Sequence, residues 1–345
     1  MLQDKIEPAW LDAFDAVLRR CAVKPGDTVA VLAESQSRAL LCDLAALAAA
    51  RAGCQVFRLT VPSVFATSSP VARSTGASPA LAGMAPVVAA LAASTLVVDC
   101  TVEGLMHAPE LPAILKGGAR VLYVSNEHPE ALARLAPDDK TEPLVKEHIK
   151  RLRAAKQMRV TSPAGTDLTI ALAGASCGGN WGYTVRPGTM THWPGGLALA
   201  FPAAGSVNGT LVLAEGDVNL TFKRYIERPV TLHITNDYVD KIEGAGVDAE
   251  LMRSYIAAWG DRDAYAVSHV GYGLNTAARW DSMALYDKRD FNGTELRAFS
   301  GNFLYSTGAN EVAKRFTQGH FDLPMRNCTV QLDGVTVVDA GKVVA

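Results

Sequence analysis

The sequence has no C-x-x-C pair, no nucleotide-binding glycine motif and no apolar run long enough to span a membrane. Its six cysteines are scattered, which argues against cysteine ligation of a metal and indicates reduced thiols in a cytoplasmic protein. The longest apolar stretch, residues 39–52, contains Asp43 and Arg51, so we expect no membrane as partner. The acidic, amphipathic N-terminal residues do not resemble a targeting segment.

An excess of charge of either sign is also lacking. The chain has 33 Lys and Arg against 35 Asp and Glu, a net charge of −2. This balance gives no reason to expect a nucleic acid as partner. A hydrophobic content of 49% indicates an ordered protein, and 345 residues are enough for two domains that each have a core.

Continuous apolar runs alternate with helical segments through the first part of the chain. The expected strands cover residues 28–32, 55–61, 95–99 and 120–125. Such a pattern predicts an open, mostly parallel α/β sheet domain over residues 1–155. Because no G-x-G-x-x-G follows the first strand and no Gly-Lys-Ser/Thr motif occurs anywhere, the sheet is interpreted as a scaffold.

One loop of this scaffold is expected to reach a ligand. The loop from Asp99 to Pro109 leaves the carboxyl end of a parallel strand, where open α/β sheets usually bind ligands. It carries Met106 and His107, which we interpret as substrate contacts. An alternative for His107 is that it caps the helix expected to start near Pro109.

Alternating strands and glycine turns mark the second part, residues 156–345. They predict a mixed or antiparallel α+β domain, with a helix near residues 249–259 and functional residues on its late strands and loops. Back in the first domain, the loop Pro62–Pro79 is either a mobile flap or an oligomer contact, and we expect a homo-oligomer. His128 and His148 are expected at the surface.

The metal hypothesis starts from His320-Phe321-Asp322. Side chains at i and i+2 of an extended segment point to the same side, although this pair alone favours a surface turn in which the aspartate accepts backbone hydrogen bonds. A third candidate is His269, which lies between glycines and apolar residues. Two histidines and one carboxylate form the facial triad of non-haem Fe(II) enzymes, and zinc accepts the same ligands.

The glycine-rich segment of residues 177–194 is the second candidate site. Its Trp181, Tyr183 and Trp193 suit either a slot for an aromatic ring or ordinary loop packing. His192 in the same segment is a candidate acid or base, for which a pKa near neutrality is expected. Ser306 has no nucleophile elbow around it, so we interpret its hydroxyl as a contact to a ligand.

Several segments, in the same order over nearly the whole chain, resemble the 2,5-dihydroxypyridine 5,6-dioxygenases, the Fe(II) ring-cleaving enzymes of nicotinate catabolism. They are LVVDC (96–100), LMHAPE (105–110), WGY (181–183), THWPGG (191–196), SHVGYG (268–273), SGNFLYSTG (300–308) and GHFDLPMRNC (319–328). The resemblance implies a non-haem, extradiol-type dioxygenase that converts 2,5-dihydroxypyridine, or a closely related hydroxylated N-heterocycle, with O2. For 2,5-dihydroxypyridine the implied product is N-formylmaleamate.

The same resemblance implies one Fe(II) per chain, with His269, His320 and Asp322 as ligands. It also implies that His107, His192 and Ser306 lie around the substrate, and we expect Met106, Asn180 and Trp181 to contact the substrate as well. Asn180 departs from the family pattern, which has a glutamate there, so proton handling is expected to fall to His192. The alternative is an M29-like metallo-aminopeptidase, which needs additional glutamate ligands; Glu215 and Glu243 are the nearest candidates.

Overall fold

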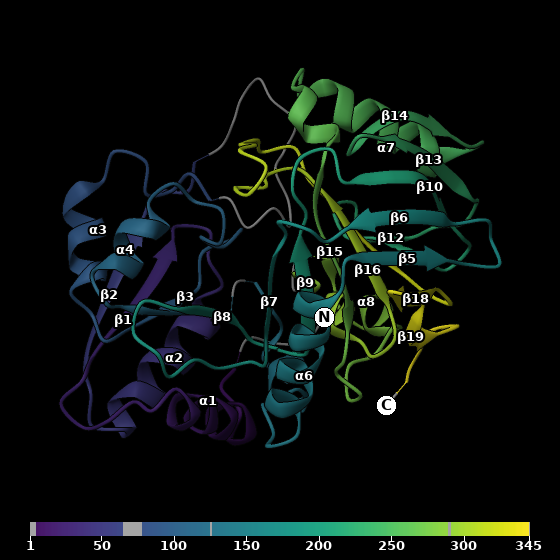
Figure 1. Ribbon diagram of the computed structural model, residues 1–345. Coiled ribbons are helices and arrows are strands. Elements are labelled where there is room, and N and C mark those ends of the chain that lie inside the picture. The colour runs from purple at the N-terminus through teal and green to yellow at the C-terminus, as the bar shows by residue number, and fades with distance from the viewer. Residues whose placement is uncertain (1–4, 65–77, 125, 289–290, 345) are drawn as a thin grey trace.

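The computed structural model describes residues 5–64, 78–124, 126–288 and 291–344. It confirms the expected fold class, because a parallel α/β sheet is followed by a larger part built from antiparallel sheets and a few helices (Figure 1). No helix within these ranges is long and apolar enough to cross a membrane. Most of the loop Pro62–Pro79 lies outside the described residues.

The parallel sheet has the strand order β2-β1-β3-β4-β8. Its first four strands are β1 (Thr28–Glu34), β2 (Gln55–Val61), β3 (Leu96–Asp99) and β4 (Arg120–Tyr123). Helices α1 (Pro8–Arg20) and α2 (Ala39–Arg51) cover one face, and α3 (Ala85–Ala92) and α4 (Leu111–Lys116) cover the other. The fifth strand, β8 (Met190–His192), comes from the second half of the chain and pairs in parallel with β4.

The strand order reverses between β1 and β3, so ligands are expected outside the carboxyl ends of these strands. The loop after β3 leaves this switch point and is held by the buried carboxylate of Asp99. Its Oδ1 accepts a hydrogen bond from Thr101 N at 2.9 Å, and its Oδ2 accepts one from Leu105 N at 2.9 Å. Met106 follows directly. His107 does not cap α4, since Glu110 occupies the cap position.

Helices α5 (Pro129–Arg134) and α6 (Thr141–Ala154) lead to the antiparallel sheets. One sheet has eight strands in the order β14-β13-β10-β6-β5-β18-β19-β20. The bounds are β5 (Gln157–Thr161), β6 (Asp167–Ala171), β10 (Val207–Leu213), β13 (Val230–Thr235), β14 (Tyr238–Glu243), β18 (Thr329–Leu332), β19 (Val335–Asp339) and β20 (Lys342–Val343).

A second antiparallel sheet has the order β17-β16-β15-β9-β7. Its bounds are β7 (Ser176–Asn180), β9 (Leu197–Phe201), β15 (Val267–Gly273), β16 (Phe303–Thr307) and β17 (Phe321–Met325). The remaining elements are β11 (Val218–Asn219), β12 (Arg224–Tyr225), α7 (Val247–Ala258), a 3-10 turn (Arg262–Tyr265), α8 (Ser282–Leu285) and α9 (Thr294–Ala298).

The two faces of this five-stranded sheet have different partners, because successive side chains of a strand point to opposite sides. Tyr305 and Phe321 belong to the large apolar cluster shared with the eight-stranded sheet. Leu304, Ser306 and Asp322 lie on the other face, and Leu304 and Asp322 line a cavity there. The sandwich core therefore holds one face rigidly and leaves the other for the site.

Two histidines expected at the surface are buried, and this expectation was wrong. His128 is 1% exposed; its Nδ1 accepts a hydrogen bond from Glu130 N at the start of α5, and its ring stacks on Tyr286. His148 is 2% exposed, and its Nδ1 lies 3.1 Å from the hydroxyl of Tyr272. Both histidines serve packing between elements that the sequence pattern does not place together.

Asp99→Asn tests the charge state of the buried carboxylate. Burial raises the pKa of Asp99 from 3.8 to about 6, so the folded protein binds this proton more tightly than the unfolded chain does. The resulting stabilisation is present below the unfolded pKa and is lost as the pH rises through 6. The unfolding free energy of the wild type, relative to that of Asp99→Asn, should therefore fall by on the order of 3 kcal/mol from about pH 3 to about pH 7. Urea denaturation measures it, and a flat difference would contradict the prediction.

Candidate functional site

A β-bulge brings His269 to the centre of the candidate site. Val267 pairs with Thr307 and Val270 pairs with Tyr305, so two residues of β15 lie opposite the single residue Ser306. A bulge of this kind changes the direction of a side chain and is common beside active sites. His269 Nε2 consequently lies 3.0 Å from Ser306 Oγ.

Ser268 determines which nitrogen of His269 carries the proton. Its hydroxyl donates to the carbonyl oxygen of Ala309, so it can only accept from His269 Nδ1, 3.0 Å away. Burial lowers the pKa of His269 to about 3, which keeps the ring neutral. Nε2 therefore has a free lone pair, and it points toward Ser306 and Asp322.

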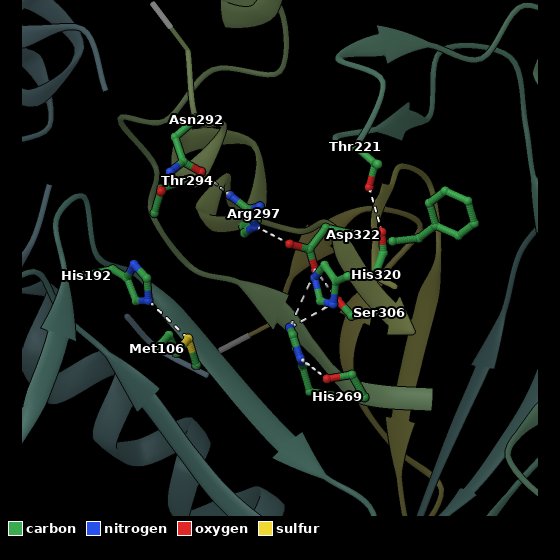
Figure 2. A network of polar contacts seen from close by, with 12 residues as sticks. Met106, His192, Thr221, His269, Asn292, Thr294, Arg297, Ser306, His320 and Asp322 are labelled. Carbon is green, nitrogen blue, oxygen red and sulfur yellow. Dashed lines mark hydrogen bonds and ion pairs between the residues drawn. The ribbon is translucent and has the colours of Figure 1, made fainter. Parts of the chain in front are cut away.

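His320 and Asp322 meet His269 from the other side of β16, which lies between β15 and β17 in the sheet (Figure 2). Asp322 lies opposite Ser306 in the pairing of β16 with β17, and His320 precedes β17 directly. The Nε2 atoms of His320 and His269 lie 3.2 Å and 3.7 Å from Asp322 Oδ1. Two ligand atoms that are each about 2.1 Å from one ion, at a right angle, are about 3 Å apart.

Two acceptors of the site lie at the hydroxyl of Ser306, and one of them, the carboxylate of Asp322, is also hydrogen-bonded to His320. The Ser306 hydroxyl donates to Asp322 Oδ1 and also lies beside the lone pair of His269 Nε2, but it has one hydrogen. A cation would satisfy both acceptors. The rings of His269 and His320 are 6.1 Å apart between centroids, and nowhere in the described residues are three or more His, Cys, Asp or Glu side chains already closed around a metal position.

Arg297 keeps the carboxylate ionised. Its Nε lies 2.5 Å from Asp322 Oδ2, and both side chains are almost completely buried. Burial by itself raises the pKa of Asp322, but the guanidinium and His320 outweigh it and hold the pKa well below its usual range. Asp322 Oδ1 is therefore an anionic ligand atom, directed at the two imidazoles.

Seven of the predicted site residues line one cavity, which has about 720 Å³ of empty volume including its mouth. They are Met106, His107, Asn180, His192, His269, His320 and Asp322. The loop after β3 supplies Met106 and His107, and β8 supplies His192, whose Nε2 lies 3.2 Å from the sulfur of Met106 (Figure 2). Residues more than 200 positions apart in the sequence therefore meet at the edge between the sheets.

Two histidines of the cavity, His107 and His192, are neutral at pH 7. Burial lowers the pKa of His192 to about 3 and that of His107 to about 4. The value for His192 is lower than the near-neutral pKa expected from the sequence, because Arg297 adds a nearby positive charge to the desolvation. At neutral pH His192 can accept a proton.

Asn180 and Trp181 point to different places. Asn180, the last residue of β7, lines the cavity, and its Oδ1 is buried without a hydrogen-bond partner among the described residues. Trp181 is absent from the residues that line this cavity, contrary to the expectation. It borders a separate groove with Leu144 and stacks under Lys146, because adjacent residues of an extended chain face opposite sides.

Sequence reasoning missed several residues of the site. Arg297, Thr294 and Asn292 line the cavity beside the candidate ligands, yet no motif in the sequence marks them.

Ser306 lies beneath the cavity and contacts His269 and Asp322. Glu243, a candidate extra glutamate ligand, instead binds His233 Nε2 at 2.7 Å.

Comparisons with known proteins agree on one family. The family model described as NicX, 2,5-dihydroxypyridine 5,6-dioxygenase, matches residues 9–345. A curated 2,5-dihydroxypyridine 5,6-dioxygenase of Pseudomonas putida KT2440 is 39% identical over 341 residues, which are 96% of this chain and 95% of the relative.

Solved structures give the same result. The 2,5-dihydroxypyridine dioxygenase from Pseudomonas putida KT2440 superposes with a TM-score of 0.93 at 36% identity and covers 99% of both chains. AmpT from Thermus thermophilus has a TM-score of 0.64 at 12% identity, over 98% of this chain and 99% of its own, and shares the fold.

Gly308→Ala tests whether the position of His320 controls cation binding. Gly308 has a φ of +114°, and a Cβ there would lie 2.6 Å from Gly319 O and 3.1 Å from His320 Nδ1. We expect the displaced imidazole to weaken Co²⁺ binding by about 10–100-fold, measured by calorimetric titration.

The matched control is Gly334→Ala. Gly334 has a φ of +83°, so alanine meets comparable backbone strain, but nothing lies within 4 Å of its Cβ position. This variant should bind Co²⁺ as the wild type does. Equal Co²⁺ affinities of the two variants would contradict the role assigned to Gly308.

Proposed function

The chain belongs to the 2,5-dihydroxypyridine 5,6-dioxygenase family, and we propose that it uses O2 to open the ring of 2,5-dihydroxypyridine, or of a closely related hydroxylated N-heterocycle. The product from 2,5-dihydroxypyridine would be N-formylmaleamate, a step in nicotinate degradation. The observation that carries the proposal is the convergence of His269, His320 and Asp322 on the wall of a largely apolar cavity.

We propose one Fe(II) per chain, held by these three residues. The donor set fits, since it combines imidazole nitrogen with an ionised carboxylate and contains no thiolate. When bound, Fe(II) supplies open positions where the substrate oxygen and O2 are brought together. The acceptors that share the single Ser306 proton support a cation at this place.

Neighbouring residues prepare the substrate. His192 lines the cavity in its neutral form and is proposed to assist proton transfer from a ring hydroxyl of the substrate. Leu197, Leu199 and Leu304 form an apolar wall that limits the access of water to the ring. His107 is also neutral and lines the cavity, so it is a further acceptor for the substrate.

Asn180 is proposed to recognise the edge of the ring. Its buried Oδ1 lacks a partner within the described part of the chain and lines the cavity, so a ring N–H or hydroxyl can satisfy it. An amide cannot act as a base at this position, which leaves His192 as the residue for proton transfer. Free thiols at all six cysteines support the proposal of a reducing, cytoplasmic location.

Oxygen uptake tests the proposed reaction. The protein is reconstituted anaerobically with Fe(II) and then given 2,5-dihydroxypyridine and O2. We expect one iron per chain, stoichiometric oxygen consumption and N-formylmaleamate as product. His269→Ala, His320→Ala and Asp322→Ala should each lower kcat/KM by more than about 100-fold, because each removes a proposed ligand.

His233→Ala is the matched control, since this half-exposed histidine pairs with Glu243 on the eight-stranded sheet. It should retain wild-type activity. No oxygen consumption with any hydroxypyridine despite bound iron would refute the proposal. Two ions per chain and activity without O2 would favour the aminopeptidase alternative.

Asn180→Leu tests recognition of the ring. Loss of one buried hydrogen bond to the substrate should lower kcat/KM by about 10–100-fold. The melting temperature should not fall, because Oδ1 has no partner to lose among the described residues. Asn180→Asp, which keeps an acceptor there, should retain more activity than Asn180→Leu. Equal losses in both variants would argue against an acceptor role.

A further inference from the structure

Helix α9 lies between the first domain and the candidate ligand Asp322. Thr294 and Arg297 are three positions apart, share one face of the helix and both line the cavity. Glu295, two positions from Arg297, faces the opposite way. The helix has five residues and cannot be stable by itself, so its position depends on contacts at both faces.

Two interactions hold α9 on the side of the first domain, one through Glu127 and one through Arg134. Glu127, after β4, is 1% exposed, and its Oε1 accepts a hydrogen bond from Thr294 N at 2.7 Å. Arg134, the last residue of α5, binds Glu295 through two parallel contacts of 2.7 and 2.8 Å. The Glu295 side chain is 1% exposed and also accepts from Arg279 N. Such a bidentate pair, with a buried carboxylate and a partly exposed guanidinium, fixes orientation as well as distance.

On the cavity side, Arg297 fixes one oxygen of Asp322. Its Nε lies 2.5 Å from Oδ2, and its Nη1 lies 3.2 Å from Asn292 Oδ1 (Figure 2). Asn302 Nδ2 donates to the carbonyl oxygen of Arg297 at 2.9 Å, which ties down the end of the helix. Since Oδ2 is held by the guanidinium, the rotation of the carboxylate is set, and Oδ1 faces His269 and His320.

We propose that Glu127, Arg134 and Glu295 are positioning residues that act through α9 and Arg297 to orient Asp322. The contact between the two domains thereby determines the direction of a carboxylate in the active site. Within the proposed function, this couples correct seating of the first domain, which also brings Met106 and His107, to the geometry of the metal ligands. None of the three residues lines the cavity.

The test compares Arg134→Met, Arg134→Lys and the double variant Arg134→Met/Glu295→Gln with the wild type. The double variant leaves no unpaired charge buried, so it keeps the test decisive if the single variant does not fold. Arg159→Met is the control, because it breaks a bidentate but exposed pair with Asp167 on the eight-stranded sheet. Three quantities are measured: hydrogen exchange of residues 321–325 in metal-free protein, Co²⁺ affinity, and kcat with KM after loading with Fe(II).

We expect exchange in residues 321–325 to rise by about 10-fold in the double variant, Co²⁺ affinity to fall by about 10-fold, and kcat to fall more than KM changes. Arg134→Lys keeps the charge but loses the second contact. Its values in the three measurements should lie between those of the wild type and those of the double variant. The control should match the wild type in all three. Unchanged exchange of residues 321–325 in the double variant would overturn the proposal, whatever the activity.

These outcomes separate the inference from the proposed function. A wild-type protein that binds iron but consumes no oxygen would refute the function, while the exchange comparison on metal-free protein would still decide the role of α9. Conversely, an active wild type and an equally active double variant would refute only the positioning role.

Discussion

The site depends on two imidazoles and one carboxylate that converge beside the hydroxyl of Ser306. The bulge in β15 directs His269 toward Ser306, and the pairing of β16 with β17 places Asp322 on the same face. Ser268 fixes the tautomer that leaves His269 Nε2 without a proton. An arrangement of this kind is unfavourable without a positive charge, which explains why Arg297 approaches one side of the carboxylate and a metal ion is proposed at the other.

The sandwich of antiparallel sheets makes this arrangement rigid. Tyr305 and Phe321 are buried against the eight-stranded sheet, and the residues that follow them in alternation face the cavity. Slipping the register by one residue would move Asp322 into the apolar core, where its charge would have no partner. Packing on one face therefore determines the positions of the polar groups on the other.

Segments from both halves of the sequence enclose the cavity. β8 leaves the antiparallel part and joins the parallel sheet beside β4, where His192 stacks on Tyr123. The loop held by Asp99 supplies Met106 from the switch point of the same sheet. The proposed substrate contacts thus come mainly from one sheet and the candidate metal ligands from the other, and the packing of the two sheets determines the shape of the cavity.

Local patterns were sufficient for the fold class and for most of the candidate residues. Apolar runs indicated the parallel sheet, and the i, i+2 spacing of His320 and Asp322 indicated a shared side of one extended segment, because both are properties of neighbouring residues. The position of Trp181 outside the cavity, the burial of His128 and the presence of Arg297 at Asp322 could not be predicted in this way. Each depends on contacts between segments far apart in the chain. The sequence by itself therefore determined which chemical groups are available, whereas only the tertiary structure decided their partners, orientation and charge, since these follow from burial and from long-range strand pairing.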